Sequence, residues 1–344
     1  MSRKWVVTLL LSIMSLTFAQ QEGKNPSLPY HSNDYGIQIT PAAGPRVTGP
    51  WNAFFTADFI YWTMRQEGLS YSTSEKIPSS SKAGAIHDLD WKWEPGFRLG
   101  GGCNLPYDGW DLQTRYTWIH GDARDSRSLK GVEGESSTLA PRWVVKGCSA
   151  DLMSAYAHWN SHYQELLLEV GRNSYWSPRF KVRLHTGLEA SWIDQSYFIQ
   201  YTEKNEVMHD LKLEQKFWGI GLRTGLNTSW ELTKNVSVFG DLALASIWGK
   251  VDEKRRENKK ERRELSTVFN LEDHVHKLEP VLNLALGLRW EAWIDHDRLH
   301  FSMEAGWEHQ VWLAHGLWIQ KEGELYHRGD LSLQGLTLKG RFDF

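Results

Sequence analysis

The sequence has only two cysteines, Cys103 and Cys148, in 344 residues. Two cysteines cannot form the disulfide framework that stabilises small secreted domains. The sequence also has no Cys/His metal pattern, no glycine-rich phosphate loop and no Gly-x-Ser-x-Gly turn. Its formal net charge of −3 gives no reason to expect a nucleic-acid partner. We therefore expect no metal, no cofactor and no catalytic residues.

Long apolar runs are missing beyond the N-terminus. The first nineteen residues resemble a secretory signal, with a basic start at Arg3 and Lys4 and an apolar core from Trp5 to Phe18. We expect cleavage after Ala19, because the run is too short to favour the alternative, a membrane-spanning anchor. No later stretch approaches the ~18 apolar residues that a spanning helix needs, which excludes a helical membrane protein.

Residues 20–50 contain five prolines, and proline interrupts both helices and strands. We expect this segment to be an extended periplasmic lead-in. Residues 51–344 then form the remaining domain, in which segments of alternating hydrophobicity recur.

The last fifteen residues alternate strictly between apolar and polar side chains. Phe344, Phe342 and Leu338 share one face, and Arg341 and Lys339 share the other. A period of two is the signature of a β-strand. Outer-membrane β-barrels end on such an aromatic strand, so we expect Phe342 and Phe344 to be the signal read by the barrel assembly machinery. The charged face would line a lumen and the apolar face would contact lipid.

Ten segments show this alternation. They lie near residues 53–63, 97–105, 110–118, 158–171, 179–198, 212–230, 236–249, 278–293, 298–312 and 330–344. An even number of strands places both termini of the chain on the periplasmic side of the membrane. The sequence therefore predicts an all-β fold, a transmembrane antiparallel outer-membrane β-barrel of about ten strands, with eight to twelve allowed.

The connections between these segments alternate in length. The expected short turns are 106–109, 173–178, 231–235 and 294–297. The expected longer connections are 64–91, 121–157, 199–211, 250–277 and 313–329. Short periplasmic turns and longer outer loops are typical of outer-membrane barrels.

One face of most segments carries ionisable side chains. In residues 179–198, Lys181, Arg183, His185 and Glu189 share a face, which a soluble two-layer sheet would not bury. The candidates for the lumen are Asp58, Arg98, Asp111, Arg115, Lys181, Arg183, His185, Glu189, Arg223, Asp241, Arg289, Glu291, Glu304, Glu308, Lys339 and Arg341. Ten strands give a backbone diameter of roughly 20 Å, which leaves at most a narrow passage. A selective pore and a lumen filled by salt bridges both remain open.

The 19 tryptophans suit the aromatic girdles of a membrane barrel. Trp218 and Trp230 share a face and are twelve residues apart, which corresponds to about 30 Å along the membrane normal. The candidate girdle residues are Trp110, Trp118, Trp192, Trp218, Trp230 and Trp290.

Two further features have mainly structural interpretations. Lys250 to Glu264 carries eight basic and five acidic residues and is interpreted as a solvated outer loop. The alternatives are a short helix with i,i+4 ion pairs and a surface that contacts lipopolysaccharide phosphates. His274 and His276 have a spacing that suits a metal on a strand, but no third ligand lies nearby in the sequence.

Three short segments carry a family resemblance: Ala57-Asp-Phe-Ile-Tyr-Trp62, Gly171-Arg-Asn-Ser-Tyr175 and Trp192-Ile-Asp-Gln195. Together with Arg183, His185, Gly187 and Leu188, they make residues 51–344 resemble the major outer membrane protein-like porins of Chlamydia-related bacteria and Legionella. The resemblance implies an abundant surface porin that lets small solutes diffuse, and it carries over no catalytic residues. Such proteins are often cysteine-rich and cross-linked, whereas this chain has two cysteines. The resemblance therefore does not extend to a disulfide-linked role in the envelope.

The sequence thus favours a porin-like barrel in a Gram-negative outer membrane, where ions or small hydrophilic solutes diffuse passively. The alternative is a non-conducting structural or adhesive barrel whose loops contact other surfaces, and a barrel enzyme is disfavoured. We expect outer-membrane lipid, lipopolysaccharide and the assembly machinery as partners, and we leave formation of a homo-oligomer open.

Overall fold

The computed structural model describes residues 42–45, 47, 52–77, 84–129, 136–149, 151–261, 264–294, 298–319 and 327–344. The expected signal sequence, residues 1–19, lies outside these described residues, as does most of the expected lead-in, residues 20–50. Ala42 and Ala43 at the end of the lead-in contact the barrel, where the Ala43 amide donates to the Asn173 carbonyl oxygen over 3.0 Å. Within the described part of the chain, no helix is long and apolar enough to span a membrane.

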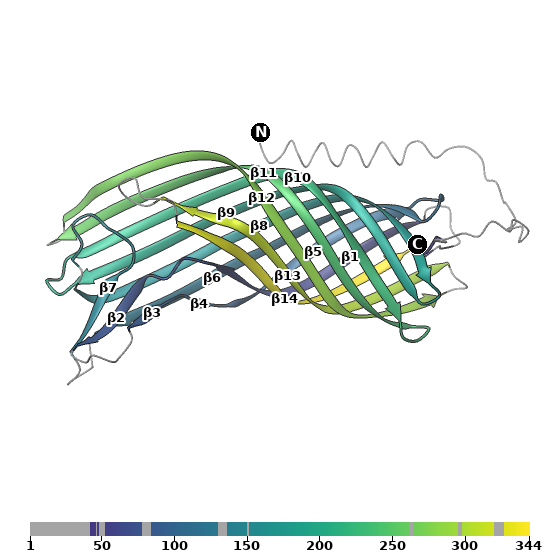
Figure 1. Cartoon of the computed structure of the whole chain (residues 1–344), viewed down its shortest axis with the longest axis horizontal. Coiled ribbons are helices and arrows are strands. Elements are labelled where there is room, and N and C mark those ends of the chain that lie inside the picture. The colour runs from purple at the N-terminus through teal and green to yellow at the C-terminus, as the bar shows by residue number, and fades with distance from the viewer. Residues whose placement is uncertain are drawn as a thin grey trace, which may run out of the picture. The chain divides into compact units, whose positions relative to one another are not determined.

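Ten long strands form the main sheet. They are β1 (Ala53–Gln66), β5 (Trp93–Asn104), β6 (Trp110–Ser128), β8 (Leu152–Ser177), β9 (Phe180–Glu203), β10 (Met208–Glu231), β11 (Val236–Glu261), β12 (Glu264–Ile294), β13 (Leu299–Trp318) and β14 (His327–Asp343). Each strand pairs antiparallel with its two neighbours, and β1 pairs with both β5 and β14, which closes the sheet into a barrel (Figure 1). The predicted all-β barrel of about ten strands is confirmed.

The C-terminal strand closes the barrel as the last fifteen residues predict. β14 pairs with β1 from Phe54↔Asp343 to Gln66↔Leu331. The backbones of Ala53 and Phe344 exchange two hydrogen bonds, of 2.9 and 3.0 Å. The chain therefore ends inside the seam, with the Phe344 ring 6.0 Å from that of Phe342 on the outer surface.

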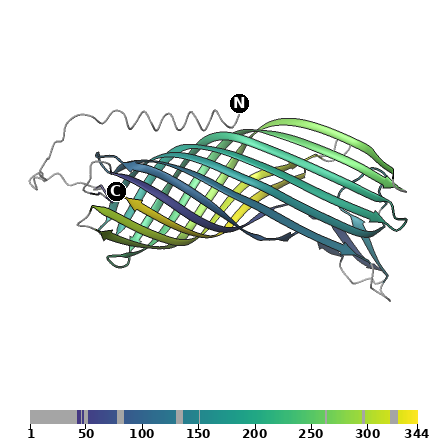
Figure 2. The same cartoon turned by 180° about the vertical axis from the view of Figure 1, so that it is seen from behind.

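One end of the barrel has short turns, at residues 105–109, 178–179 and 232–235. They lie close to where the sequence predicts them, except that β8 continues to Ser177 and shortens the turn expected over 173–178. The turn expected over 294–297 lies mostly outside the described residues. The start of β1 at Ala53 and the C-terminal Phe344, which pair with each other, both lie at this short-turn end (Figure 2). Asp108 and Gly109 both adopt positive φ, 49° and 72°, which lets the chain reverse in a few residues. We call the opposite end the far end.

Two of the five expected long connections are wrong. β9 and β10 continue to Glu203 and Met208, so a four-residue turn replaces the loop expected over 199–211. β11 and β12 pair out to Glu261↔Glu264, so the described residues of this range, 250–261 and 264–277, are also strand rather than loop. The strands of this wall, β8 to β12, reach well beyond β13 and β14 in Figures 1 and 2.

The charged segment from Lys250 to Glu264 is therefore neither a helix nor an irregular loop. Its side chains alternate across the sheet, with Val251 and Arg255 buried inside and Lys254 exposed outside. Lys254 pairs with Glu272 on the neighbouring strand over 2.9 Å instead of with a residue four positions along a helix. Cross-strand pairing satisfies the backbone of this segment despite its charge.

The remaining strands belong to the long connections at the far end. They are β2 (Ser72–Ile77), β3 (Ala85–His87), β4 (Asp90–Trp91) and β7 (Ser136–Pro141), of which β4 extends the barrel sheet and the other three form a small sheet. These connections fold into the interior of the barrel, where two tyrosines of β9 hold them. The Tyr197 hydroxyl donates to the Leu69 carbonyl over 2.5 Å, and the Tyr201 hydroxyl donates to the Tyr71 carbonyl over 2.6 Å. We call the inward residues Leu69, Tyr71, Trp143 and Val145 the outer closure.

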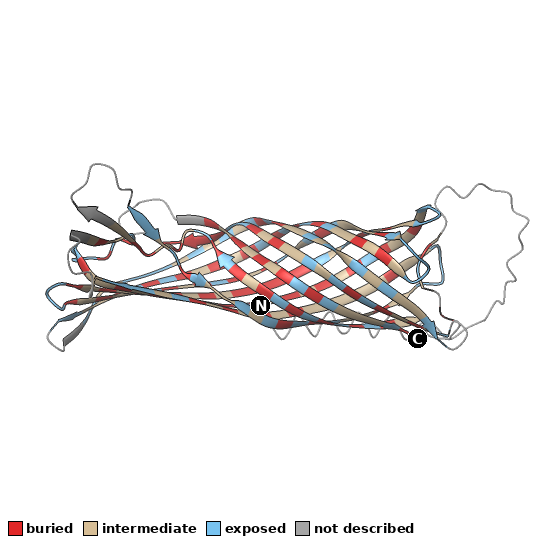
Figure 3. Cartoon of the chain, turned by 90° about the horizontal axis from the view of Figure 1, so that it is seen from below, coloured by how far each residue is buried: buried red, intermediate tan, exposed pale blue. Residues whose placement is uncertain are grey.

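The outer surface near the short turns is a belt of exposed apolar side chains. On β1, Phe55, Phe59 and Tyr61 are exposed, whereas Ile60 and Trp62 between and beside them are buried. The same alternation of buried and exposed positions runs around the whole barrel wall (Figure 3). A continuous apolar belt of this size is not found on soluble monomers, and it matches a surface that faces lipid.

Candidate functional site: the charged chamber

The half of the barrel interior next to the short turns contains a cavity of about 400 Å³, which we call the chamber. Nine basic and seven acidic side chains line it, so basic groups are the more numerous among those that reach the cavity. Of the sixteen residues proposed for the lumen, thirteen line the chamber: Arg98, Arg115, Lys181, Arg183, His185, Arg223, Asp241, Arg289, Glu291, Glu304, Glu308, Lys339 and Arg341. They come from several strands because every inward strand position faces the same axis.

The other three candidates lie behind this lining. Asp58, Asp111 and Glu189 are almost fully buried, and each is covered by an arginine that does reach the cavity. These three carboxylates are therefore not exposed to a solute. They hold in place the arginine guanidinium groups that reach the cavity.

The first cluster is built around Arg98 on β5. Its two terminal nitrogens donate to the two carboxylate oxygens of Glu308 on β13, each over 3.0 Å. One of them also lies 3.3 Å from Asp58 on β1, and the guanidinium lies 5.3 Å from the centre of the Trp62 ring. A planar guanidinium can satisfy two carboxylates and an aromatic face at once, which a lysine could not.

The second cluster joins β6, β8, β9 and β10. Arg183 donates to both oxygens of Asp111, the shortest contact being 2.6 Å. Arg223 lies 2.9 Å from Glu189 and 3.1 Å from Glu169, and His185 lies 3.4 Å from Glu169. Opposite charges therefore alternate around this wall, which lowers the cost of keeping them away from bulk water.

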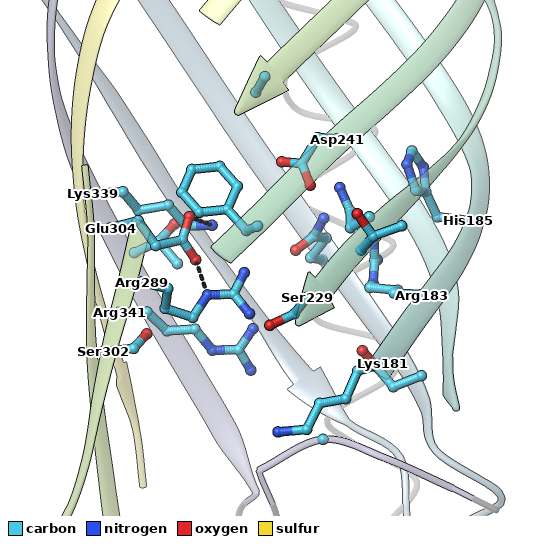
Figure 4. A pocket seen from close by; sticks show the side chains of 18 of the residues that line it. Lys181, Arg183, His185, Ser229, Asp241, Arg289, Ser302, Glu304, Lys339 and Arg341 are labelled. Carbon is cyan, nitrogen blue, oxygen red and sulfur yellow. Dashed lines mark hydrogen bonds and ion pairs between the residues drawn. The ribbon is translucent and has the colours of Figure 1, made fainter. Parts of the chain in front are cut away.

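The third cluster lies on the opposite wall. Arg289 on β12 donates to Glu304 on β13 over 2.8 Å, and Lys339 on β14 approaches the same carboxylate at 3.4 Å. Arg341 contacts Asp343 at 2.6 Å and lies over the Phe54 ring, 3.7 Å from its centre. Figure 4 shows this group facing Lys181, Arg183 and His185 across the cavity.

Glu165 and Glu169 also line the chamber, and the sequence analysis missed both. They lie on β8, where their inward neighbours Trp159, Tyr163 and Leu167 are apolar. Because that face is mostly apolar, its residues did not show the row of ionisable side chains by which the other lumen faces were predicted. The one available signal was position, since both glutamates fall in phase with the inward residues of the predicted strand.

A layer of aromatic side chains ends the chamber towards the far end. We call Trp62, Trp159, Tyr163, Phe217 and Trp312 the aromatic layer, and each is at most 1% exposed. The Trp312 ring packs edge to face on those of Tyr163 and Phe217, with centroids 6.1 and 5.8 Å apart. Beyond this layer the outer closure fills the mouth, where Trp143 packs on Tyr197 at 5.7 Å. The far half of the interior is thus filled mainly by apolar side chains, with a few buried ion pairs such as Arg255–Glu257, whereas charged groups line the open half.

The six candidate girdle tryptophans fall into two groups along the barrel wall, and one of them, Trp192, is buried. Trp230 and Trp290 are exposed near the short turns, and Trp110 begins β6 at the same end. Trp192 and Trp218 face each other on adjacent strands closer to the far end, and Trp118 stacks on Phe97 with ring centroids 5.6 Å apart. This arrangement suits two girdles, which remain a proposal.

The histidine pair singled out in the sequence does not gather further ligands. Nδ1 of His274 lies 2.5 Å from Asp252, and His276 stacks on Trp248 with ring centroids 6.5 Å apart. Among the residues that the structure describes, a different group brings three metal-binding side chains together at the far end. Its members are Cys148, Glu203 and His209.

Several known proteins are similar to this chain. OmpT, an outer membrane protease from Escherichia coli, is 12% identical over 85% of this chain and 97% of its own, with a TM-score of 0.43. The CymD monoaromatic hydrocarbon channel is 8% identical over 90% and 95%, with a TM-score of 0.31. A major outer membrane protein from Thermus thermophilus is 10% identical over 85% and 99%, with a TM-score of 0.29. No curated protein matches the sequence.

The likenesses to solved structures are too distant to support any function. The family described as Legionella pneumophila major outer membrane protein precursor, in contrast, matches residues 44–344. This match confirms the resemblance to the Legionella proteins and the outer membrane of a Gram-negative bacterium as the location. The chain therefore belongs to the Legionella major outer membrane protein family.

Proposed function

We propose that the chain is a porin-like channel for ions and small hydrophilic solutes, with the chamber as its selective part and the aromatic layer as its closed constriction. The observation that carries this proposal is the chamber itself. A lumen that served stability alone would be packed with side chains, whereas here charged groups border about 400 Å³ of open space. The proposal requires no cofactor and no catalytic residue.

The charge of the wall supports a preference for anions. Basic side chains outnumber acidic ones in the lining, and Arg289, Arg341 and Lys181 extend into the cavity from opposite walls (Figure 4). Charges at the wall of a narrow aqueous cavity act through little intervening water, so a small excess alters the local ion concentration. Lys181→Met should therefore reduce the anion preference.

Passage requires the aromatic layer to move, because its rings leave no space around Trp312. We expect purified protein in planar bilayers to show small, infrequent conductance steps that favour anions. Trp312→Ala should give larger and more frequent steps. Trp290→Ala is the matched control, since that tryptophan lies on the outer surface and does not obstruct the lumen.

The second candidate is a non-conducting structural barrel, and the filled far half favours it. Leu69 and Tyr71 of the outer closure are fully buried, in addition to the aromatic layer beneath them. A wild-type protein that never conducts, together with a conducting Trp312→Ala variant, would support this candidate and refute the channel. If the protein conducts but Lys181→Met does not change its ion preference, the chamber is not the selective part of the channel.

A further inference from the structure

Three side chains with metal-binding atoms meet at the far end, away from the chamber. Cys148 lies in the connection after β7, Glu203 is the last residue of β9 and His209 is the second residue of β10. Their ligand atoms all lie within 4.8 Å of one another, and Nε2 of His209 lies 3.1 Å from Oε1 of Glu203. In a tetrahedral zinc site, bonds of about 2.0–2.3 Å place neighbouring ligand atoms about 3.3–3.7 Å apart. The three atoms can thus surround an ion after small side-chain movements.

The backbone holds these residues together from both sides. The Ser149 amide donates to Oε1 of Glu203 over 2.6 Å, which fixes the carboxylate beside the cysteine. The Cys148 amide donates to the Val145 carbonyl over 3.2 Å in a turn where Gly147 has a φ of 78°. The three residues are therefore positioned by the β9–β10 hairpin and by the constrained turn around Gly147.

A plain ion pair between His209 and Glu203 would explain only part of this arrangement. Such a pair has no use for a thiol, and Sγ of Cys148 makes only a weak contact of 3.5 Å with the Ser149 carbonyl oxygen. His209 is fully buried, and its Nδ1 has no hydrogen-bond partner among the described residues. The orientation of the imidazole thus depends on the cluster around its Nε2.

We propose that Cys148, Glu203 and His209 bind one divalent transition-metal ion of the zinc type. Sulfur, imidazole and carboxylate donors together suit zinc, whereas magnesium and calcium prefer oxygen alone. Three protein ligands leave a fourth position for water. The ion would tie the turn that contains Cys148 to the β9–β10 hairpin and so hold the neighbouring Trp143 and Val145 of the outer closure in the mouth.

The test uses the full-length folded barrel in detergent, treated with a chelator and then titrated with Co²⁺ as a spectroscopic probe. We expect one Co²⁺ per chain, a thiolate-to-cobalt charge-transfer absorption and displacement by Zn²⁺. Cys148→Ser should abolish that absorption and weaken binding by more than the roughly 10–100-fold that the loss of an outer-shell partner costs. Cys103→Ser is the matched control, because Cys103 lies on β5 near the short turns.

Heat-modifiable migration on gels shows whether each variant is folded, and His209→Gln provides a second variant if Cys148→Ser is not. Zn²⁺ should also slow proteolysis near residues 142–149 in wild type but not in either variant. Wild-type protein without stoichiometric Co²⁺ binding, or a charge-transfer band that survives Cys148→Ser, would overturn the site. Binding is measured without conductance, so the site and the channel proposal can fail separately.

Discussion

The two halves of the barrel have opposite polarity, and single strands show both. In the half of β9 near the short turns, Arg183 points inward and Leu184 is exposed on the outer surface. Further along the same strand, Tyr197 and Ile199 are fully buried inside. Phe198 between them still faces outward, but the outward positions that follow, Gln200 and Thr202, are polar. The strand keeps its period of two throughout, but the apolar face changes from outside to inside.

The surrounding medium explains this inversion. Next to lipid, the outer surface must be apolar and the lumen can be polar, whereas in water the reverse pattern forms an ordinary hydrophobic core. On β11 the outward residues change from Leu244 and Trp248 to Lys250 and Lys254, which marks where the lipid ends. About ten further residues of β9 then project roughly 25 Å into water.

The inversion also divides the stability of the barrel into two kinds. The far half resembles the core of a soluble protein, in which rings such as Phe217 fill the space and substitutions leave cavities. The half near the short turns depends on buried ion pairs around an open chamber, where the loss of one partner matters more than the loss of volume.

The same truncation should cost different amounts in the two halves. Phe217, in the aromatic layer, packs on Trp312 and His315, so Phe217→Ala should destabilise by about 3–5 kcal/mol. Phe239 is also buried but borders the chamber, so Phe239→Ala only enlarges an existing cavity and should cost at least ~1 kcal/mol less. Urea unfolding of both variants in lipid vesicles measures the difference. Equal losses would mean that the chamber is as tightly packed as the aromatic layer.

Charge removal should have a large effect at the chamber wall. Arg98→Met leaves the buried carboxylate of Asp58 and the partly exposed carboxylate of Glu308 without their partner, which should cost about 3–5 kcal/mol. Replacing all three, with Asp58→Leu and Glu308→Met added, should restore most of that stability, because an apolar cluster has no charge to desolvate. The same unfolding assay applies. If Arg98→Met alone is as stable as wild type, water from the chamber solvates the two carboxylates.

The sequence predicts the fold near the short turns well because each strand there alternates apolar and charged residues in the phase that lipid requires. The seam at Phe344 and the lumen position of Arg98 both follow from that alternation alone. The strands of the far half could not be predicted in this way, because there the apolar residues point inward and most outward residues are polar. Residues 199–211 and 250–277 consequently looked like loops, although they keep the same period of two.

The metal-ligand cluster and the outer closure could not be predicted for a different reason. Cys148 and Glu203 are 55 residues apart and meet only because a long connection folds back into the mouth. The sequence of that connection has no periodicity that would indicate an inward path. Glu169, in contrast, could have been predicted as a lumen residue from the sequence, since it lies in phase with the inward residues of β8.

The lipid boundary can be tested with one substitution at two places. Leu184 is exposed on the apolar belt, and Leu184→Arg should destabilise the barrel by about 2–4 kcal/mol if it lies near mid-membrane. Leu232 is exposed to a similar extent in a short turn, where Leu232→Arg should change little. Heat-modifiable migration and urea unfolding report both effects. Similar losses at the two sites would refute the assignment of the belt to lipid.

The smallest predicted effect concerns pH at the far end, outside the lipid. Burial raises the pKa of Glu253 to about 8, with Lys277 opposing and Asp273 adding to the shift. Between its ordinary pKa near 4.5 and about 8, the folded barrel thus binds more protons than the unfolded chain, and stability falls as pH rises through this window. Glu253→Gln removes the group, so its stability relative to wild type should rise as pH rises across this window.

Glu272 provides the control for sign. It lies on the outward face of β12, where the hydrogen bond from Lys254 lowers its pKa, so its ionised form stabilises the fold. Glu272→Gln should therefore be slightly less stable than wild type above its ordinary pKa of 4.5, opposite to Glu253→Gln. Unfolding of the three proteins at about pH 5 and about pH 8.5, on either side of the Glu253 transition, measures both differences. A Glu253→Gln variant whose stability relative to wild type does not change with pH would show that water reaches Glu253, and that the core of the far half stops short of it.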